Sequence, residues 1–170
     1  MVQKGFTFIE LLIVIATLAI LSTTVIVALN PLEYLFRAND TRRISAVVEL
    51  GHAMDAYVIT RTNGVYPTLS PEILTWQSSF LMPAGEIGVP VSVNAITLNC
   101  TTNSEGNLCY DSNGTDAVIW TVLESRVNRN NAGCIVPDVV VAVWIGSQGK
   151  TGLTCIPDVS SIPSYNSIVN

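Results

Sequence analysis

The sequence contains few charged residues, and this scarcity limits the class of protein it can encode. Only 12% of its 170 residues are Asp, Glu, Lys or Arg, against roughly 25% in an average soluble domain, while 49% are hydrophobic. A disordered chain has the opposite balance. The net charge is −5, whereas a general nucleic-acid-binding protein is basic. The composition therefore excludes a disordered chain and disfavours both a soluble enzyme and strong nucleic-acid binding.

The longest stretch without charge, residues 11–32, lies near the N-terminus. As a helix, its 22 residues would span ~33 Å, enough to cross a ~30 Å hydrocarbon core. It is too long for the apolar core of a secretory signal peptide, and no small-residue cleavage site precedes Asn30-Pro31. Lys4 lies on its N-terminal side, which favours a cytoplasmic N-terminus, although three arginines follow the stretch. The pattern predicts a single membrane-spanning helix.

The charge is divided unequally along the chain. Residues 1–63 contain five basic and five acidic side chains, whereas residues 64–170 contain three basic and eight acidic ones and therefore carry the whole net charge of −5. The second part is thus predicted to form an acidic head on a neutral helical segment.

Sequence signals of catalysis and metal binding are missing. The chain has one histidine, His52, and no G-x-S-x-G nucleophile elbow, P-loop or dinucleotide-binding glycine pattern. Its cysteines lack the short spacing of zinc knuckles. We therefore predict no enzyme activity, no cofactor and no metal. Calcium bound by Asp111, Asn113 and Asp116 is the one alternative left open.

Glu10 is an anomaly, because a carboxylate within an apolar membrane segment is costly unless it lies at the interface or meets a partner. It belongs to the run Lys4-Gly5-Phe6-Thr7-Phe8-Ile9-Glu10-Leu11-Leu12-Ile13-Val14-Ile15-Ala16. This run resembles the N-terminal signature of bacterial type IV pilins and type II secretion pseudopilins. In that signature a short basic leader ends in Gly, and Glu is the fifth residue of the mature chain.

The resemblance implies a processing site and an assembly site. Prepilin peptidase would cut between Gly5 and Phe6, and Phe6 would become the N-methylated first residue. Glu10 would meet the terminal ammonium of a neighbouring subunit in a filament, and two desolvated opposite charges attract strongly. A glycine at the cut also gives a peptidase close access to the backbone.

The sequence predicts a helix that continues beyond the apolar stretch. Asn30-Pro31 predicts a kink or local melting, because proline removes a helical hydrogen bond. Residues 33–63 then show an amphipathic helical pattern that should pack on a sheet, so the whole helix would run from about Phe6 to Thr62. The exit Asn63-Gly64-Val65-Tyr66-Pro67-Thr68 resembles the N-G-x-Y-P-T pattern of pilins and major pseudopilins.

The head, residues 64–170, is predicted to be rich in β structure. A short helical turn is expected at Leu69–Trp76, and Trp76, Trp120 and Trp144 are expected in the core. Four strands are expected, at Ile87–Val93, Ala95–Asn99, Ala117–Glu124 and Val139–Ile145. The uniformly apolar Val139–Ile145 is typical of a strand covered on both faces.

All four cysteines lie in the head, which predicts two disulfides in an exported domain. The sequence leaves three connectivities open. We favour Cys100–Cys109 across a polar loop and Cys134–Cys155 around the last predicted strand. The second pairing resembles the pilin arrangement in which a disulfide closes the C-terminal region.

The expected fold is α+β, the type IV pilin fold, in which a long N-terminal helix packs on a small antiparallel sheet. Its parts would be a leader (1–5), an apolar transmembrane and polymerisation helix (6–32), an amphipathic helix (33–63) and the head (64–170). The expected function is a structural subunit of a type IV pilus. The alternatives are a type II secretion pseudopilin and a minor pilin whose head binds a surface or DNA.

The same resemblance implies the partners and the location. The partners would be prepilin peptidase, copies of the chain itself, an assembly platform and the inner membrane, with no strong nucleic-acid binding. The chain would be single-pass in the cytoplasmic membrane before assembly and in an extracellular filament afterwards.

Overall fold

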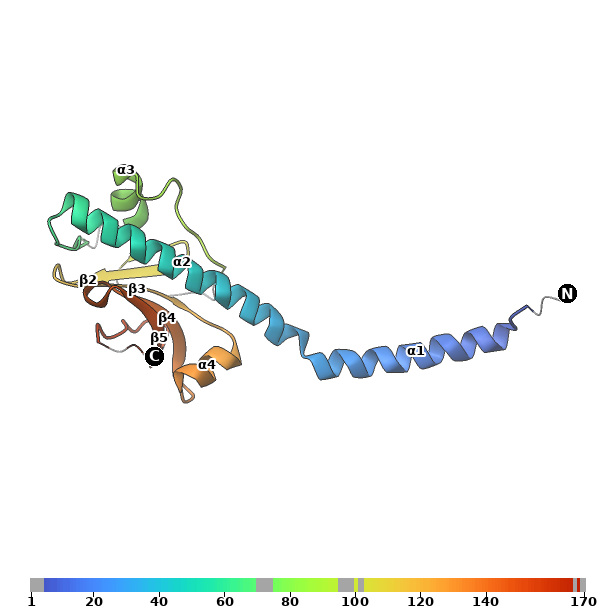
Figure 1. The fold of residues 1–170 in the computed structure, drawn as a ribbon. Helices are drawn as coiled ribbons and strands as arrows, with labels where there is room; N and C mark the ends of the chain where they lie inside the picture. The colour runs from blue at the N-terminus through green and yellow to red at the C-terminus, as the bar shows by residue number, and fades with distance from the viewer. Residues whose placement is uncertain (1–4, 70–74, 95–99, 101–102, 167, 169–170) are drawn as a thin grey trace. The chain divides into compact units, whose positions relative to one another are not determined.

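The computed structural model (Figure 1) describes residues 5–69, 75–94, 100, 103–166 and 168. The chain has an α+β fold with an apolar N-terminal helix and a small antiparallel sheet. It divides into two compact units, residues 1–35 and residues 36–170, which are described separately below.

The first helix, α1 (Phe8–Leu29), ends where Asn30 adopts a left-handed conformation, with φ 42° and ψ 65°. The second helix, α2 (Pro31–Arg61), begins immediately afterwards. Proline is well tolerated as the first residue of a helix, because the N–H that it lacks would have no helical acceptor there. The interruption predicted at Asn30-Pro31 is therefore present, and it divides the expected helix into two.

The head contains one five-stranded sheet in which each strand pairs antiparallel with its sequence neighbours. The strands are β1 (Asn103–Glu105), β2 (Leu108–Ser112), β3 (Ala117–Val122), β4 (Val139–Ile145) and β5 (Lys150–Ile156). Two of them, β3 and β4, match predicted strands closely, and β4 is buried on both faces as its apolar sequence predicts.

Alternate residues of the central strands enter two different apolar clusters. One face of the sheet, which includes Ile119, Ala142 and Trp144, packs with α2 residues such as Leu50 and Met54. The opposite face packs with Val159, Tyr165 and Ile168 of the C-terminal segment, and its buried strand residues are Cys109, Val118, Trp120, Val122, Val141, Val143, Ile145 and Ile156. The period of two in β structure thus distributes the apolar residues over two cores.

Short helical segments connect the larger elements. They are η1 (Gln77–Leu81), α3 (Met82–Ala84), α4 (Arg126–Ala132) and η2 (Gly146–Gln148). The turn predicted at Leu69–Trp76 is only partly described, since residues 70–74 lie outside the described residues, and residue 75 is not helical. The helical structure begins at Trp76 and continues into η1.

The strand predicted at Ile87–Val93 is wrong, because this segment is irregular. The Gln77 side chain forms the backbone hydrogen bonds with Val91 that a neighbouring strand would otherwise form. Its Oε1 accepts from the Val91 N–H at 2.8 Å, and its Nε2 donates to the Val91 carbonyl at 3.1 Å. The predicted strand Ala95–Asn99 lies outside the described residues.

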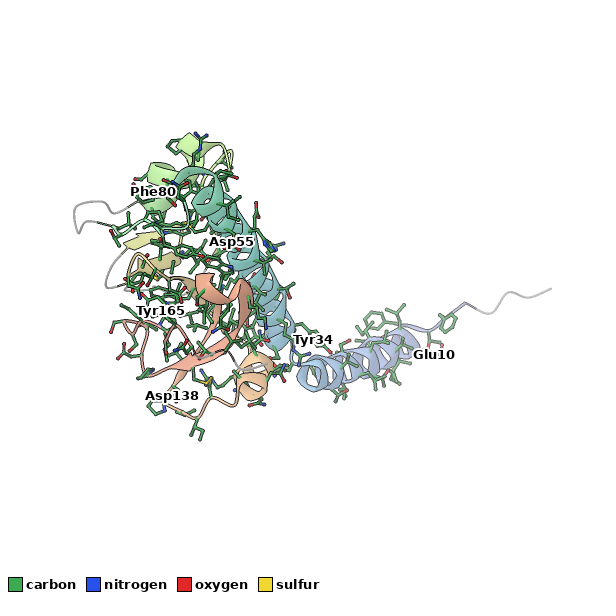
Figure 2. All side chains as sticks on the ribbon, turned by 60° about the vertical axis from the view of Figure 1, so that its left-hand side comes forward. Glu10, Tyr34, Asp55, Phe80, Asp138 and Tyr165 are labelled. Atoms are coloured by element: carbon green, nitrogen blue, oxygen red, sulfur yellow. A yellow bond between two sulfur atoms is a disulfide. The ribbon has the colours of Figure 1, made fainter. Side chains whose placement is uncertain are left out.

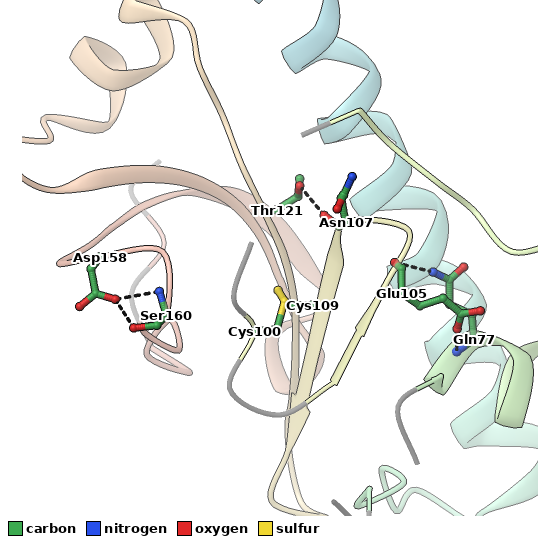
Figure 3. The surroundings of a disulfide bond; sticks show 8 residues. All are labelled: Gln77, Cys100, Glu105, Asn107, Cys109, Thr121, Asp158 and Ser160. Atoms are coloured by element: carbon green, nitrogen blue, oxygen red, sulfur yellow. Dashed lines mark hydrogen bonds between the residues drawn. A yellow bond between two sulfur atoms is a disulfide. The ribbon is translucent and has the colours of Figure 1, made fainter. Parts of the chain in front are cut away.

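Two disulfides join the described cysteines, and their pairing is the one favoured from the sequence. Cys100 pairs with Cys109 on β2, with Cα atoms 5.7 Å apart, in the region shown in Figure 3. Cys134, after α4, pairs with Cys155 on β5, with Cα atoms 5.5 Å apart. The second disulfide closes the segment that contains β4 and most of β5.

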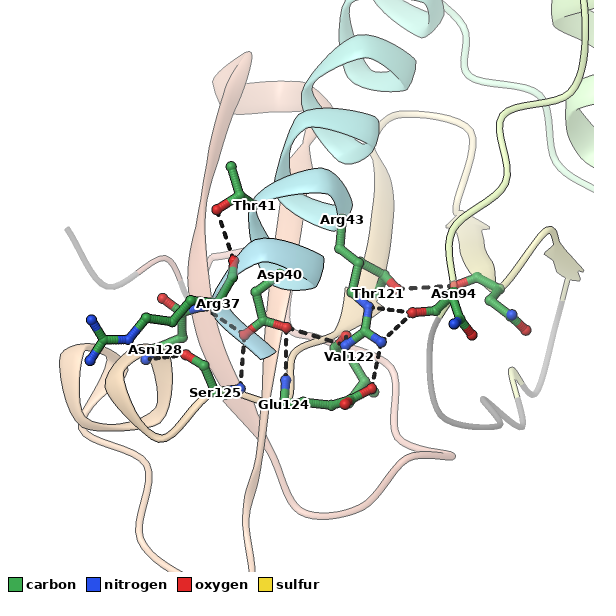
Figure 4. Close-up of polar contacts among 11 residues, drawn as sticks. Arg37, Asp40, Thr41, Arg43, Asn94, Thr121, Val122, Glu124, Ser125 and Asn128 are labelled. Atoms are coloured by element: carbon green, nitrogen blue, oxygen red, sulfur yellow. Dashed lines mark hydrogen bonds and ion pairs between the residues drawn. The ribbon is translucent and has the colours of Figure 1, made fainter. Parts of the chain in front are cut away.

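A buried charged cluster fixes α2 to the loop that follows β3 (Figure 4). Asp40 is fully buried and accepts four hydrogen bonds, from the backbone N–H groups of Glu124 and Ser125 (both 2.9 Å), from Asn128 Nδ2 (2.8 Å) and from Arg43 Nη1 (3.2 Å). The Arg43 guanidinium also pairs with the Glu124 carboxylate and donates to the Asn94 carbonyl. Every charge in the cluster therefore has a partner, as buried charges require.

Candidate functional site

The predicted processing site lies immediately before α1. Gly5 and Phe6 are exposed and non-helical, and Phe6 is 85% exposed. The rest of the predicted leader, residues 1–4, lies outside the described residues. The described part of the chain therefore leaves the Gly5–Phe6 peptide bond uncovered.

The fold gives no reason for a glycine at position 5. A Cβ atom built there meets no heavy atom within 4 Å, and Gly5 is not among the residues with positive φ. The usual structural causes of a glycine, a left-handed backbone or a close approach, are both missing. Within the described residues, neither a contact nor a left-handed backbone requires a glycine at position 5, and the same holds for Gly88.

Thr7 and Glu10 form a capping box at the start of α1 (Figure 2 labels Glu10). Glu10 Oε2 accepts from the backbone N and from Oγ1 of Thr7, both at 2.9 Å, and Thr7 Oγ1 accepts from the Glu10 N–H at 3.4 Å. These contacts satisfy N–H groups that a helix start leaves without acceptors. A cut before Phe6 would leave both residues of the capping box in the mature chain.

The rest of α1 presents apolar side chains on all sides. Residues 5–25 are exposed, and Phe8–Val25 is long and apolar enough to span a membrane, by length and composition only. The hydroxyls of Thr17, Ser22, Thr23 and Thr24 donate to carbonyls of the preceding turn at 2.7–2.9 Å. Because these polar groups are satisfied within the helix, α1 is suited to an apolar environment.

The sequence from residue 5 to residue 36 contains no Lys, Arg or His. The Glu10 carboxylate therefore cannot be neutralised by another side chain of the same helix. Its described hydrogen bonds all come from Thr7, which is neutral.

The N-G-x-Y-P-T segment forms the exit of α2. Asn63 and Gly64 take positive φ, 51° and 90°, as helix C-termini commonly do. Tyr66 is buried, its N–H donates to the Gly114 carbonyl at 2.9 Å, and its ring meets the Trp144 ring edge-on with centroids 6.2 Å apart. The segment thus locks the exit of α2 to the sheet.

Burial, followed by the Asp55 and Asp116 carboxylates, raises the pKa of Tyr66 to about 12. An unfolded tyrosine has a pKa of about 10 and so loses its proton first as the pH rises. The free energy of unfolding should therefore be at its full value below pH ~10 and fall between pH ~10 and ~12. We expect Tyr66→Phe to make this fall shallower, as measured by urea unfolding at pH ~9 and ~11. An unchanged slope would contradict the prediction.

The three residues kept as a calcium alternative already accept hydrogen bonds within the chain. Asp111 Oδ2 accepts from the Tyr165 hydroxyl at 2.7 Å, Asp116 Oδ1 accepts from the Ala117 and Ser147 N–H groups, both at 2.7 Å, and Asn113 Oδ1 accepts from backbone N–H groups of its own turn. Within the described ranges no group of three or more His, Cys, Asp or Glu side chains could hold a metal ion. His52 is exposed on α2.

The three tryptophans expected in the core are buried, with exposures of 0–1%. The Asp40–Arg43–Glu124 cluster was not predicted. Asp40 and Arg43 look like surface charges of an amphipathic helix in the sequence, and Glu124 is more than 80 residues away. No local pattern in the sequence could have identified the cluster.

Comparisons with known proteins find no matching family model, no similar curated protein and no similar solved structure.

Proposed function

We propose that this chain is the structural subunit of a type IV pilus, cut between Gly5 and Phe6, N-methylated on Phe6 and polymerised through α1. Its work would be assembly rather than catalysis. Its partners would be prepilin peptidase, the inner membrane, an assembly platform and further copies of the chain. It would be a single-pass membrane protein before assembly and part of an extracellular filament afterwards.

The observation that carries the proposal is Gly5. It is exposed, it is not among the residues with positive φ, and a Cβ atom built on it meets no heavy atom of the described residues within 4 Å, so the described fold does not require glycine there. Processing after glycine accounts for the residue, and the exposed Gly5–Phe6 bond is accessible to a peptidase.

The chemistry of α1 supports the same proposal. A carboxylate in an apolar helix is costly away from the membrane interface unless it meets a partner, and no side chain between residues 5 and 36 supplies a cation. Cleavage before Phe6 creates an ammonium group only four residues from Glu10. In a bundle of such helices, the ammonium of one subunit can pair with Glu10 of the next, so processing would also create the partner needed for assembly.

The head is compatible with the pilin fold, since a helix packs on an antiparallel meander and Tyr66 of the N-G-x-Y-P-T segment after the helix packs in the same core. The Cys134–Cys155 disulfide closes the C-terminal part of the sheet. This closure favours a pilus subunit over a type II secretion pseudopilin.

The test is to produce the full chain in a bacterium that has prepilin peptidase and pilus machinery but lacks its own major subunit. We expect sheared surface fibres whose subunit begins at Phe6, heavier by one methyl group and lighter by the four hydrogens of two disulfides. Intact mass and N-terminal sequencing measure this result. A wild-type chain that still begins at Met1 in these cells would overturn the proposal.

Two variants separate processing from assembly. Gly5→Val should keep its Met1 terminus and form no fibres, because a branched side chain now occupies the cut site. Glu10→Leu should be cut normally but lose at least ~90% of its fibres, because the interhelical ion pair is gone. Glu49→Gln, which removes an exposed carboxylate of α2, is the matched control and should behave as wild type. Normal fibres from Glu10→Leu would exclude the assembly role of Glu10.

A further inference from the structure

A cavity of about 420 Å³ lies in the head between α2, the turn from β4 to β5 and the C-terminal segment. Its volume is near the lower end of the ~300–1,000 Å³ typical of small-molecule sites. Val48 of α2, Trp144 of β4 and Ile168 of the C-terminal segment supply its apolar walls. The cavity is thus large enough for one ring-sized molecule.

The cavity is lined by one basic side chain, Lys150, and by one histidine, His52. Lys150 is one of only three basic residues in residues 64–170, against eight acidic ones, and His52 is the one histidine of the chain. Both line the cavity, and no Asp or Glu is among its lining residues. The cavity is therefore a locally positive site in a head of net charge −5.

These groups are also available for a ligand. Within the described part of the chain, neither the Lys150 nor the His52 side chain forms a salt bridge. His52 does interact electrostatically with Asp55, one turn further along α2, but Asp55 does not line the cavity.

The remaining polar lining is neutral. Gln148, Thr151 and Asn166 offer amide and hydroxyl groups that can both donate and accept hydrogen bonds. The Gln148 amide already donates to the Tyr165 carbonyl at 3.3 Å, which holds it beside the C-terminal segment. Such a lining suits a molecule that carries several hydroxyl groups.

We propose that this cavity binds an acidic monosaccharide. Its carboxylate would pair with Lys150 and His52, and its ring hydroxyls would bond to Gln148, Thr151 and Asn166. A zwitterionic amino acid fits less well, because no lining carboxylate would receive its ammonium group. A fatty acid fits less well, because five of the nine lining residues have polar side chains.

The proposal does not depend on filament formation, and its test uses the unassembled chain. The isotope-labelled full chain in detergent micelles is titrated with sodium galacturonate while its NMR resonances are followed. We expect saturable shifts at the Trp144 indole N–H and at the Lys150 and Thr151 amides. Neutral galactose should bind at least ~10-fold more weakly, because it lacks the charge-assisted bonds.

Two variants test the assigned roles. Lys150→Gln and His52→Gln should each weaken galacturonate binding, Lys150→Gln by ~10-fold or more, and both side chains are exposed, so the fold should be preserved. Arg126→Gln removes a positive charge outside the cavity and should leave the affinity unchanged. No saturable shifts, equal affinities for galacturonate and galactose, or an unaffected Lys150→Gln variant would each overturn the proposal. The same shifts with sodium acetate at equal affinity would show a simple anion site and would also overturn it.

Discussion

Replacing Asp40 with Asn should lower the free energy of unfolding by about 3–4 kcal/mol. The substitution keeps the volume of the side chain and so creates no cavity. It replaces one carboxylate oxygen by an NH₂ group, which would face the N–H donors of Ser125 and Asn128. Buried donors would then lack an acceptor, and each such group costs about 1–3 kcal/mol.

The measurement is urea unfolding of the full chain in detergent, followed by tryptophan fluorescence, since all three tryptophans are buried in the head. Asp138→Asn is the matched control, because Asp138 is only partly buried and its side chain forms no hydrogen bond within the described ranges. It should change the stability by less than about 0.5 kcal/mol. A loss below about 1 kcal/mol for Asp40→Asn would show that the cluster contributes little net stability.

Replacing Gly51 with Ala should destabilise the head by about 2 kcal/mol, although the same change within a helix ordinarily stabilises by up to about 1 kcal/mol. A Cβ atom at residue 51 would lie 2.4–2.6 Å from three atoms of the Trp144 indole ring. Both residues are buried, so α2 has to move away from the sheet or Trp144 has to leave its position. The overpacking thus reverses the usual sign of the substitution.

A double-mutant cycle identifies the contact responsible. Trp144→Phe introduces a smaller ring, so Gly51→Ala should cost at least ~1 kcal/mol less in that background than in the wild type. Ser45→Ala, at an exposed position of α2, is the control for helix propensity and should stabilise slightly. A Gly51→Ala chain as stable as the wild type would contradict the close approach of α2 to Trp144.

Elements with a strong apolar pattern could be predicted from the sequence. β4 is apolar throughout, and a strand buried on both faces needs that composition. The packing of α2 on the sheet follows from the three- and four-residue spacing of Val47, Leu50, Met54 and Val58, which are all buried. In these elements burial alone determines the residue types.

Elements held by polar contacts could not be predicted. α4 has the polar sequence Arg-Val-Asn-Arg-Asn-Asn-Ala, and it begins where the Ser125 side chain accepts from the Asn128 N–H and where Asp40 of α2 binds the same turn. β1 and β2 are short and contain polar residues, so they lack an apolar alternation. β1 lies within the polar loop between Cys100 and Cys109, and β2 begins at its end. Ile87–Val93 has the composition of a strand, but the Gln77 amide occupies the Val91 backbone groups.

The two candidate sites, the N-terminal processing and assembly site and the cavity, differ in how far apart their residues lie along the sequence. Gly5, Phe6 and Glu10 lie within six residues of one another, so a local pattern identified them, and their roles stay predictions. The cavity brings together residues from Val48 to Ile168, and only the folded chain places them around one cavity.

The position of Asp40 along α2 has a mechanical consequence. It is the first fully buried residue of the helix, and every apolar residue that α2 buries in the core comes after it. Tension applied to the head through the chain before Asp40 therefore reaches the hydrogen bonds to Glu124, Ser125 and Asn128 before it reaches the apolar contacts. These bonds connect two segments more than 80 residues apart, so the force passes directly to the end of β3 without stretching the intervening chain.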